Sequence, residues 1–229
     1  MKNIVVLTGA GISAESGIKT FRGSDGLWEN HKITDVATPQ AWKRDPELVL
    51  RFYNERRKQI HKVNPNQAHY SLVKLESQYN VSIITQNIDD LHERAGSSQI
   101  LHLHGQINKA RSSKDENLVY DLEEVIMKIG DLCELGSQLR PHIVWFGEAV
   151  PMMEKAIPLL AKADIVLIIG TSLQVYPAAG LLDYAPVDSQ IFVIDPNAEK
   201  LTENKNITFI NDKAGQAIPF LVDNLLKST

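Results

Sequence analysis

The chain has 229 residues, of which 43% are hydrophobic and 23% are charged, and its formal net charge is −4. This length fits one domain with a small inserted module. Lysines and arginines are scattered along a mildly acidic chain, which argues against a nucleic-acid partner. No apolar run approaches the roughly 18 residues that a membrane helix needs. Because Cys133 is the only cysteine, no internal disulfide can form, and we expect a cytoplasmic protein.

Short apolar runs rich in Val and Ile recur along the chain, and such runs are typical of strands buried in a parallel sheet. They lie at residues 4–7, 81–84, 143–146, 165–169 and 191–194, with a further run at 207–210 that suits an edge strand. Helical patterns lie between them, at residues 46–60, 67–78, 152–162, 178–184 and 214–226. This alternation predicts an α/β fold with a doubly wound, mostly parallel Rossmann-like sheet.

Two segments interrupt the alternation. Residues 106–140 are polar and irregular apart from a helical pattern near 118–129, which indicates a small inserted module. Residues 19–40 contain glycines and a proline but no strand pattern, and they predict a long functional loop. We therefore expect a single domain, with its core at about residues 1–30, 62–105 and 141–229 and the small module at about 31–61 and 106–140.

The first predicted strand leads directly into a glycine-rich turn, Gly9-Ala10-Gly11-Ile12-Ser13-Ala14. This G-x-G-x-x-A spacing suits a dinucleotide, because Gly9 permits a tight turn and Gly11 lets the backbone approach a pyrophosphate. A glycine turn without a ligand is the alternative, although the position after a buried strand favours the cofactor. A dehydrogenase would next show an acidic residue at the end of a second strand, about 20 residues on. The acids in that span follow no strand pattern, which counts against hydride transfer.

Further motifs follow in the order Thr20-Phe-Arg-Gly, Thr85-Gln-Asn-Ile-Asp, Leu103-His-Gly, Arg140-Pro-His-Ile-Val-Trp-Phe-Gly-Glu and Gly170-Thr-Ser. Together with the glycine turn they resemble the motifs of the sirtuins, the NAD-dependent protein-lysine deacylases, from about residue 4 to the C-terminus. The resemblance implies that NAD is consumed rather than reduced, with release of nicotinamide, free lysine and O-acyl-ADP-ribose. It implies acylated lysine side chains of other proteins as partners. We expect a monomer with no nucleic-acid or membrane partner.

The resemblance assigns the catalytic base to His104 and a second catalytic role to Asn87. An imidazole with a pKa near 6.5 suits a base at neutral pH. His102 lies two residues earlier and would face the same side of an extended strand, so spacing alone does not separate the two histidines. A structural histidine within a strand is the alternative for each of them.

Residues that resemble the family's NAD contacts lie in the glycine turn, in the loop after it and at the ends of later predicted strands. They are Gly9, Ala10, Gly11, Ser13, Glu15, Thr20, Phe21, Arg22, Trp28, Gln86, Asn87, Ile88, Asp89, Gly170, Thr171, Ser172, Asp195 and Ala214. The residues after position 85 follow a strand at the carboxyl edge, where open α/β sheets bind ligands. Asn and Asp there also favour local turns, which is the alternative. Asp195 stands where the family usually has Asn.

Two segments resemble those with which sirtuins clamp an extended substrate peptide, a mode that relies on backbone hydrogen bonds. Their candidate contacts are Val144, Phe146, Gly147, Glu148, Val175 and Tyr176. Tyr53 and Arg56 are spaced i, i+3 and project from one face of a predicted helix. An arginine on an otherwise apolar face requires an anionic partner. The pair resembles the Tyr-x-x-Arg of desuccinylase-like sirtuins, which binds the carboxylate of succinyl or malonyl lysine; a neighbouring Glu or water is the alternative partner.

Sirtuins usually hold a structural zinc with two Cys-x-x-Cys pairs, and this chain departs from that pattern. Ser112 and Asp115 occupy the first pair, and Cys133 and Gly136 the second. Structural zinc is normally bound by Cys, or by Cys with His, so we predict no zinc. We expect apolar packing to hold the module instead. The residues for this packing are Leu118, Leu122, Val125, Ile126 and Ile129.

The leading interpretation is an NAD-dependent protein-lysine deacylase that removes acetyl and succinyl or malonyl groups. An NAD-dependent protein ADP-ribosyltransferase on the same scaffold is one alternative. A non-catalytic NAD-sensing module is another, although the intact His104, Asn87 and Asp89 argue against it.

Overall fold

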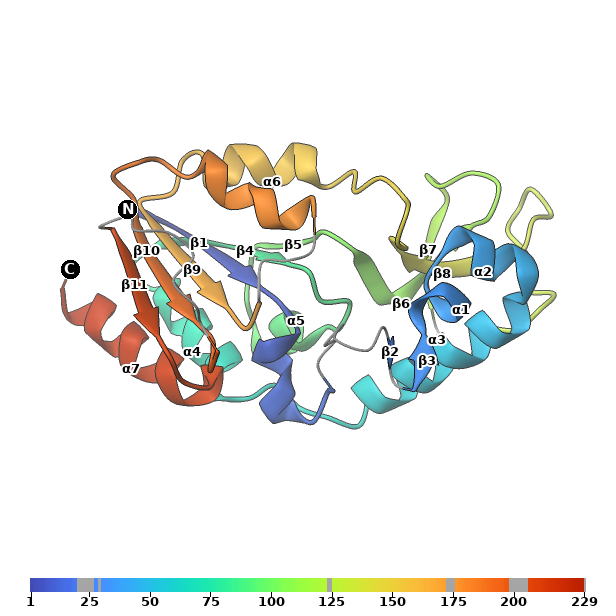
Figure 1. The fold of residues 1–229 in the computed structure, drawn as a ribbon, viewed down its shortest axis with the longest axis horizontal. Coiled ribbons are helices and arrows are strands. Elements are labelled where there is room, and N and C mark those ends of the chain that lie inside the picture. Colours follow the sequence, from blue (N-terminus) through green and yellow to red (C-terminus); the bar gives the residue numbers. More distant parts are fainter. Residues whose placement is uncertain (20–26, 29, 123–124, 172–175, 198–205, 229) are drawn as a thin grey trace.

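The larger part of the molecule is a six-stranded parallel sheet, seen on the left of Figure 1. This computed structural model describes residues 1–19, 27–28, 30–122, 125–171, 176–197 and 206–228. The strand order is β11 (Ile207–Ile210), β10 (Gln190–Ile194), β9 (Ile165–Ile169), β1 (Asn3–Thr8), β4 (Asn80–Thr85) and β5 (Ile100–His102). The predicted doubly wound α/β fold is confirmed.

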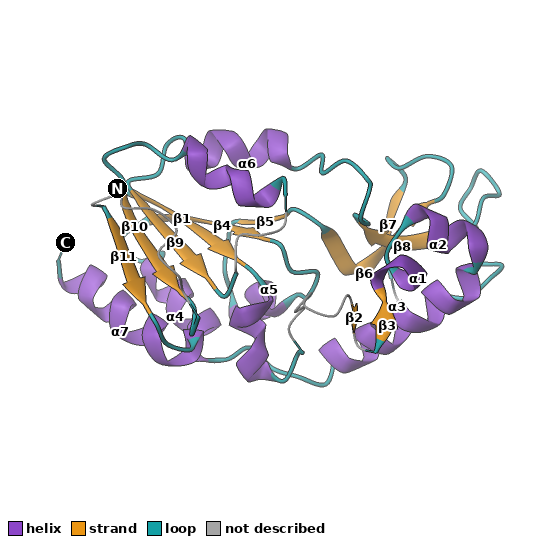
Figure 2. Cartoon of the chain, in the orientation of Figure 1, coloured by secondary structure: helices purple, strands orange, loops and turns teal. Residues whose placement is uncertain are grey.

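Helices cover both faces of this sheet (Figure 2). Ile4 and Val6 of β1 pack into the core beneath α4 (Gln67–Leu75) and α7 (Ala214–Lys227). Val5 and Leu7 face the other way, toward α6 (Met153–Leu160) and the 3-10 helix η2 (Ala178–Tyr184). Because successive side chains of a strand point to opposite faces, a strand covered on both sides must be apolar throughout. This explains why the strands appear in the sequence as unbroken apolar runs.

The chain turns back at the middle of the sheet. From β1 it continues to β4 and β5 on one side, and only later adds β9, β10 and β11 on the other. The carboxyl ends of β1 and β9 therefore form the topological switch point, where open α/β sheets bind ligands. The 3-10 helix η1 (Ala10–Ser16) and the short helix α5 (Leu91–Ala95) begin at this edge.

The strands predicted at 4–7, 81–84, 165–169, 191–194 and 207–210 are confirmed, and the last is indeed an edge strand. The predicted helices at 46–60, 67–78, 152–162 and 214–226 are confirmed with ends that shift by at most three residues. Helix α3 (Pro46–Ile60) is capped by Asp45, whose Oδ1 accepts a hydrogen bond from the Leu48 N–H at 2.9 Å. A side-chain cap and a proline in the first turn are sufficient local signals for a helix start.

A smaller region lies beside the main sheet, on the right of Figure 1. It contains an antiparallel sheet in the order β7 (Val119–Asp121), β6 (Gly105–Ser112), β8 (Leu139–Ile143). Helices α1 (Ile33–Val36), α2 (Pro39–Arg44) and α3 pack with it, and β2 (Leu27–Trp28) pairs with β3 (His31–Lys32). Its core contains Phe52 and Tyr53 of α3, Ile107 of β6 and Trp145. Residues 31–40, expected as loop, therefore carry secondary structure.

The strand expected in the main sheet at residues 143–146 is wrong. Strand β8 ends at Ile143, which pairs with Gly105 in the smaller sheet. Ile143 and Trp145 of this run are buried, whereas Phe146 is 43% exposed, and an apolar run alone does not state which sheet a strand joins.

The helix expected near residues 118–129 is also wrong. Strand β7 takes its first part, and Ile126 and Ile129 are about half exposed whereas Met127 is buried. Asn54 of α3 bonds both the N–H and the carbonyl of Met127, and Arg57 donates to the carbonyl of Val125 at 2.8 Å. These side chains replace the hydrogen bonds that a helix would have supplied. Residues 123–124 lie outside the described part of the chain.

No helix within the described ranges is long and apolar enough to cross a membrane.

Because Gly170 after β9 lies against the glycine turn after β1, we expect a side chain at this position to lower the free energy of unfolding strongly. A Cβ there would lie 2.4 Å from the Ile12 nitrogen, and Gly170 has a φ of +61°. We expect Gly170→Ala to lower the free energy of unfolding by about 2–4 kcal/mol in urea denaturation without cofactor. Gly136→Ala is the matched control, because its φ is +69° with nothing within 4 Å of the added Cβ. Its cost should be about 1–2 kcal/mol, and equal losses would contradict the close approach.

Candidate active site

The glycine turn packs directly against the end of β9. The Gly9 N–H donates to the Ile169 carbonyl at 3.0 Å, and the Gly11 N–H donates to the Gly170 carbonyl at 2.9 Å. A Cβ on Gly11 would lie 2.5 Å from the Gly170 Cα. The second glycine of the motif is therefore required by the protein's own backbone packing, in addition to the approach of a ligand.

Three side chains connect this turn with the residues after β4. Asn87 Nδ2 donates to the Gly9 carbonyl at 3.1 Å and to Ser13 Oγ at 3.2 Å, and Ser13 Oγ donates to Asp89 Oδ2 at 3.0 Å. Asn87, Ser13 and Asp89 are all buried. Both amide protons of Asn87 are used inside the protein, so the geometry leaves its Oδ1 as the group able to accept from a ligand.

Asp89 combines a carboxylate with deep burial. Burial raises the pKa of Asp89 to about 6, against the opposing effect of hydrogen bonds from the Leu91 N–H and from Ser13. The group is therefore mainly ionised at pH 7 but becomes protonated on mild acidification.

His104 lies between β5 and β6, and its Nδ1 is 3.0 Å from the Gln86 carbonyl. A carbonyl only accepts hydrogen bonds, so Nδ1 carries the proton and Nε2 of the neutral ring carries a lone pair. No described residue bonds Nε2. Burial lowers the pKa of His104 despite the bond to Gln86, which keeps the imidazole neutral at pH 7. This is the protonation state that a general base needs.

His102 has a different environment. Its Nδ1 is 3.1 Å from the Asn87 carbonyl, and its Nε2 is 2.6 Å from Glu93 Oε1. Burial alone would lower the pKa of His102, but Glu93 and the carbonyl raise it above its usual value. With both ring nitrogens facing oxygen acceptors, His102 is favoured as a charged structural group. The structure thus separates two histidines that strand spacing could not.

The other described cofactor candidates lie around the same edge of the sheet. Gln86 Nε2 donates to Thr171 Oγ1 at 3.1 Å, and Asp195 lies directly after β10. Glu15 Oε2 accepts from the Gly215 N–H at 2.7 Å, which ties η1 to the start of α7 beside Ala214.

The remaining cofactor candidates are not among the described residues at this edge of the sheet. Trp28 belongs to the smaller region, where its ring meets that of Phe52 edge-on at 4.9 Å. Thr20, Phe21, Arg22 and Ser172, together with the substrate candidate Val175, lie outside the described residues.

The first candidate substrate segment leaves β8 beside the candidate base. The Val144 N–H donates to the His104 carbonyl at 2.9 Å, and the Phe146 N–H donates to the Ala37 carbonyl at 3.0 Å. Gly147 follows with a φ of +89°. Tyr176, from the second segment, is 79% exposed. The backbone of residues 144–146 is therefore hydrogen-bonded to His104 and to Ala37, and the chain turns at Phe146 and Gly147.

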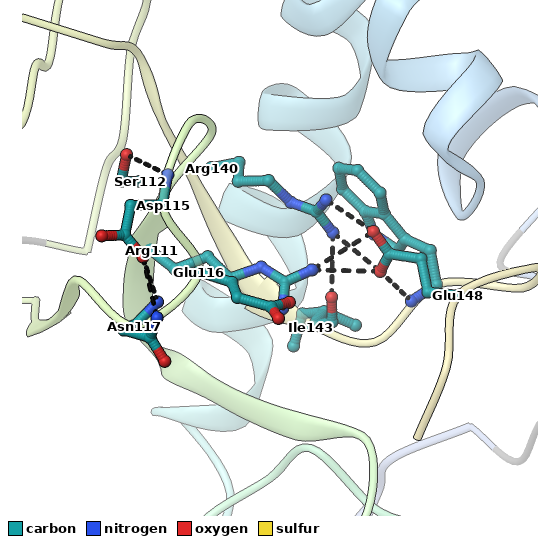
Figure 3. A network of polar contacts seen from close by, with 9 residues as sticks. Arg111, Ser112, Asp115, Glu116, Asn117, Arg140, Ile143 and Glu148 are labelled. Atoms are coloured by element: carbon teal, nitrogen blue, oxygen red, sulfur yellow. Dashed lines mark hydrogen bonds and ion pairs between the residues drawn. The ribbon is translucent and has the colours of Figure 1, made fainter. Parts of the chain in front are cut away.

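Glu148 is engaged within the protein. Its carboxylate binds Arg140 at 2.7 Å and Arg111 at 3.2 Å, and it accepts the Trp145 N–H at 2.8 Å (Figure 3). Arg140 also lies over the Trp145 ring, 3.3 Å from its centroid. Glu148 thus stabilises the position of Trp145 and of the two arginines rather than presenting a free carboxylate. Arg140 and Trp145 stand in a recognisable motif, but residue types alone did not indicate this role for them.

Tyr53 and Arg56 both lie on α3. Tyr53 is fully buried, and its Oη accepts a hydrogen bond from Trp145 Nε1 at 3.0 Å. The Arg56 guanidinium lies 5.5 Å from the Phe52 ring centroid. The neighbouring Arg57 is 1% exposed and bonds the Ile107 carbonyl at 2.8 Å, so it has a structural role that the sequence did not indicate.

The positions of the usual zinc ligands form a hydrogen-bonded cluster. Cys133 Sγ lies 3.4 Å from Ser112 Oγ and 3.1 Å from Ser137 Oγ, and the two hydroxyls are 2.8 Å apart. Ser112 Oγ also accepts the backbone N–H groups of Lys114 and Asp115. Within the described ranges, no three His, Cys, Asp or Glu residues gather as metal ligands. One thiol among hydroxyls does not fit a structural zinc site.

Comparison with known proteins agrees with this geometry. Residues 9–177 match the Sir2 family. The chain is 56% identical over 227 residues to an NAD-dependent protein deacylase of Helicobacter pylori, with 99% of each chain covered. It is 51% identical over 231 residues to an NAD-dependent protein deacylase of Bacteroides thetaiotaomicron, again with 99% of each covered.

Solved structures give the same result. A Sir2 homologue in complex with NAD superposes with a TM-score of 0.88 at 39% identity, covering 99% of this chain and 90% of that one. A complex described as Sir2, p53 peptide and NAD+ superposes with a TM-score of 0.77 at 28% identity, covering 98% and 92%. The chain therefore belongs to the Sir2 family, the sirtuins.

Proposed function

We propose that this protein is an NAD-dependent protein-lysine deacylase in which His104 acts as the general base. The observation that carries the proposal is the hydrogen bond from His104 Nδ1 to the Gln86 carbonyl, which leaves the Nε2 lone pair available. This nitrogen would accept the proton of a ribose hydroxyl. A positioned base of this kind contributes about 10²–10⁴-fold to a rate.

NAD fits the edge of the sheet where β1 and β9 end. The glycine turn lies at the switch point, and both Asn87 Nδ2 bonds are made within the protein, so the Asn87 Oδ1 is the group able to accept from a ligand. NAD would supply an electrophilic ribose carbon with nicotinamide as leaving group. We assign Asn87 and Asp89 to orient the ribose and nicotinamide, because Ser13 fixes both side chains.

The protein substrate would bind along residues 144–147, which follow β8 and begin with a hydrogen bond from the Val144 N–H to the His104 carbonyl. Strand addition uses mainly backbone hydrogen bonds, so sequence preference around the acyl-lysine should be weak. Among acyl groups we propose acetyl, succinyl and malonyl, with Tyr53 and Arg56 contacting the terminal carboxylate of the acidic ones. An arginine fork suits a carboxylate through paired hydrogen bonds.

We also propose that the enzyme works as a monomer, in the cytoplasm and without zinc. The cluster of Ser112, Cys133 and Ser137 supports the last point, because its hydrogen bonds connect the same segments that a zinc ion would. The single cysteine is compatible with a reducing compartment.

The first test concerns His104. We expect His104→Tyr to lower NAD-dependent deacylation at least about 100-fold, because the base is lost. Mass spectrometry of acetyl- and succinyl-peptides, with and without NAD, measures this directly. His102→Gln is the matched control, since both nitrogens of His102 are engaged within the protein, and it should retain more activity than His104→Tyr. Label from NAD that remains on protein, without O-acyl-ADP-ribose, would instead indicate ADP-ribosyl transfer.

The second test concerns the acyl group. Arg56→Met keeps an unbranched apolar stem but removes the cation. We expect it to raise KM for a succinyl-peptide about 10- to 100-fold, because a charge-assisted pair is worth roughly 1.5–3 kcal/mol. Deacetylation should change much less. An equal loss for both peptides would refute the carboxylate role.

The third test concerns the metal. We expect purified protein to contain far less than one zinc per chain, and a strong chelator to leave its thermal unfolding midpoint unchanged. Elemental analysis and calorimetry measure the two quantities. Stoichiometric zinc that is lost together with stability would show that the serine cluster is a metal site.

A further inference from the structure

The residues before and after Trp145 are both hydrogen-bonded to other parts of the chain, and the residue before it bonds to the candidate base. The Val144 N–H bonds the His104 carbonyl, and the Phe146 N–H bonds the Ala37 carbonyl. The indole is 2% exposed and lies in the core of the smaller region. Its position therefore depends on residues from β8, the His104 loop and the end of α1.

The indole nitrogen determines the direction of the Tyr53 hydroxyl. Trp145 Nε1 is a hydrogen-bond donor only, so its bond to Tyr53 Oη, at 3.0 Å, occupies a lone pair of that oxygen. The hydroxyl proton must then point away from Trp145. No described residue accepts that proton, although Tyr53 is fully buried. A buried donor without an acceptor is costly, and a ligand acceptor would remove the cost.

Two further features favour the Tyr53 hydroxyl as a hydrogen-bond donor that points away from Trp145. Burial raises the pKa of Tyr53, so the hydroxyl stays protonated and able to donate. Arg140 lies 3.3 Å from the Trp145 ring centroid and is held there by Glu148 (Figure 3). A cation against the indole face draws electron density from the ring and strengthens its N–H as a donor.

We propose that Trp145 is a positioning residue that fixes the Tyr53 hydroxyl as a donor to the acyl group and so favours acyl-lysines that end in a carboxylate. The inference rests on the proposed function of Tyr53 and Arg56. A carboxylate oxygen accepts the Tyr53 proton in a charge-assisted hydrogen bond, whereas the methyl end of an acetyl group offers no acceptor.

The test is a double-mutant cycle between Trp145→Phe and Tyr53→Phe, with kcat and KM measured for succinyl- and acetyl-peptides of one sequence. Each single variant should lower the succinyl-to-acetyl ratio of kcat/KM about tenfold, mainly through KM for the succinyl-peptide. The double variant should be no lower than Tyr53→Phe alone, because both changes remove the same directed hydrogen bond.

Trp42→Phe is the matched control. The Trp42 ring lies 5.9 Å from that of Trp145 in the same core, so its loss tests packing without the bond to Tyr53. It should keep the wild-type ratio. Biosynthetic replacement of the three tryptophans by benzothienylalanine preserves ring shape but removes the N–H, and it should lower the ratio even where Trp145→Phe fails to fold.

The outcomes separate the two proposals. A Trp145→Phe variant that weakens both peptides equally, or that still lowers the ratio when Tyr53 is already Phe, overturns the positioning role alone. A Tyr53→Phe variant without effect on the ratio overturns the acyl-carboxylate role and the inference with it.

Discussion

Gly11 and Gly170 bring the ends of β1 and β9 into backbone contact, and the candidate site is arranged around this approach. A Cβ on either glycine would lie within 2.5 Å of the other loop's backbone. With the two loops in contact, Ser13 reaches across to Asn87 and Asp89 after β4. The same close approach that closes the core thus also orients the polar side chains at the switch point of the sheet.

Electrostatic environment separates two histidines that are two residues apart. Both donate from Nδ1 to neighbouring carbonyls, of Gln86 for His104 and of Asn87 for His102. Only His102 also meets a carboxylate, Glu93, which stabilises its charged form. His104 has no such partner among the described residues, and burial keeps it neutral. A neutral candidate base and a charged histidine therefore arise from the same local backbone pattern.

Side-chain hydrogen bonds stabilise the smaller region at two places. One is the position of the usual zinc ligands, and the other is the segment that we expected to be a helix. Ser112 accepts two backbone N–H groups and meets Cys133 and Ser137. Asn54 and Arg57, from α3, bond the backbone of residues 125–127.

The sequence by itself determined the α/β class, the positions of the main helices and five of the six strands of the main sheet. These features follow from local signals, because strands covered on both faces must be apolar throughout and the start of α3 is marked by Asp45. Short β5 escaped notice because three half-buried residues leave no periodic pattern.

Only the tertiary structure decided which sheet Ile143 joins and why residues 118–129 form no helix, because both depend on partners distant in the chain. The same reason holds at the site. His102 and His104 differ in protonation because they contact different residues from other parts of the chain. Glu148 likewise binds two arginines that spacing along the sequence does not identify as its partners.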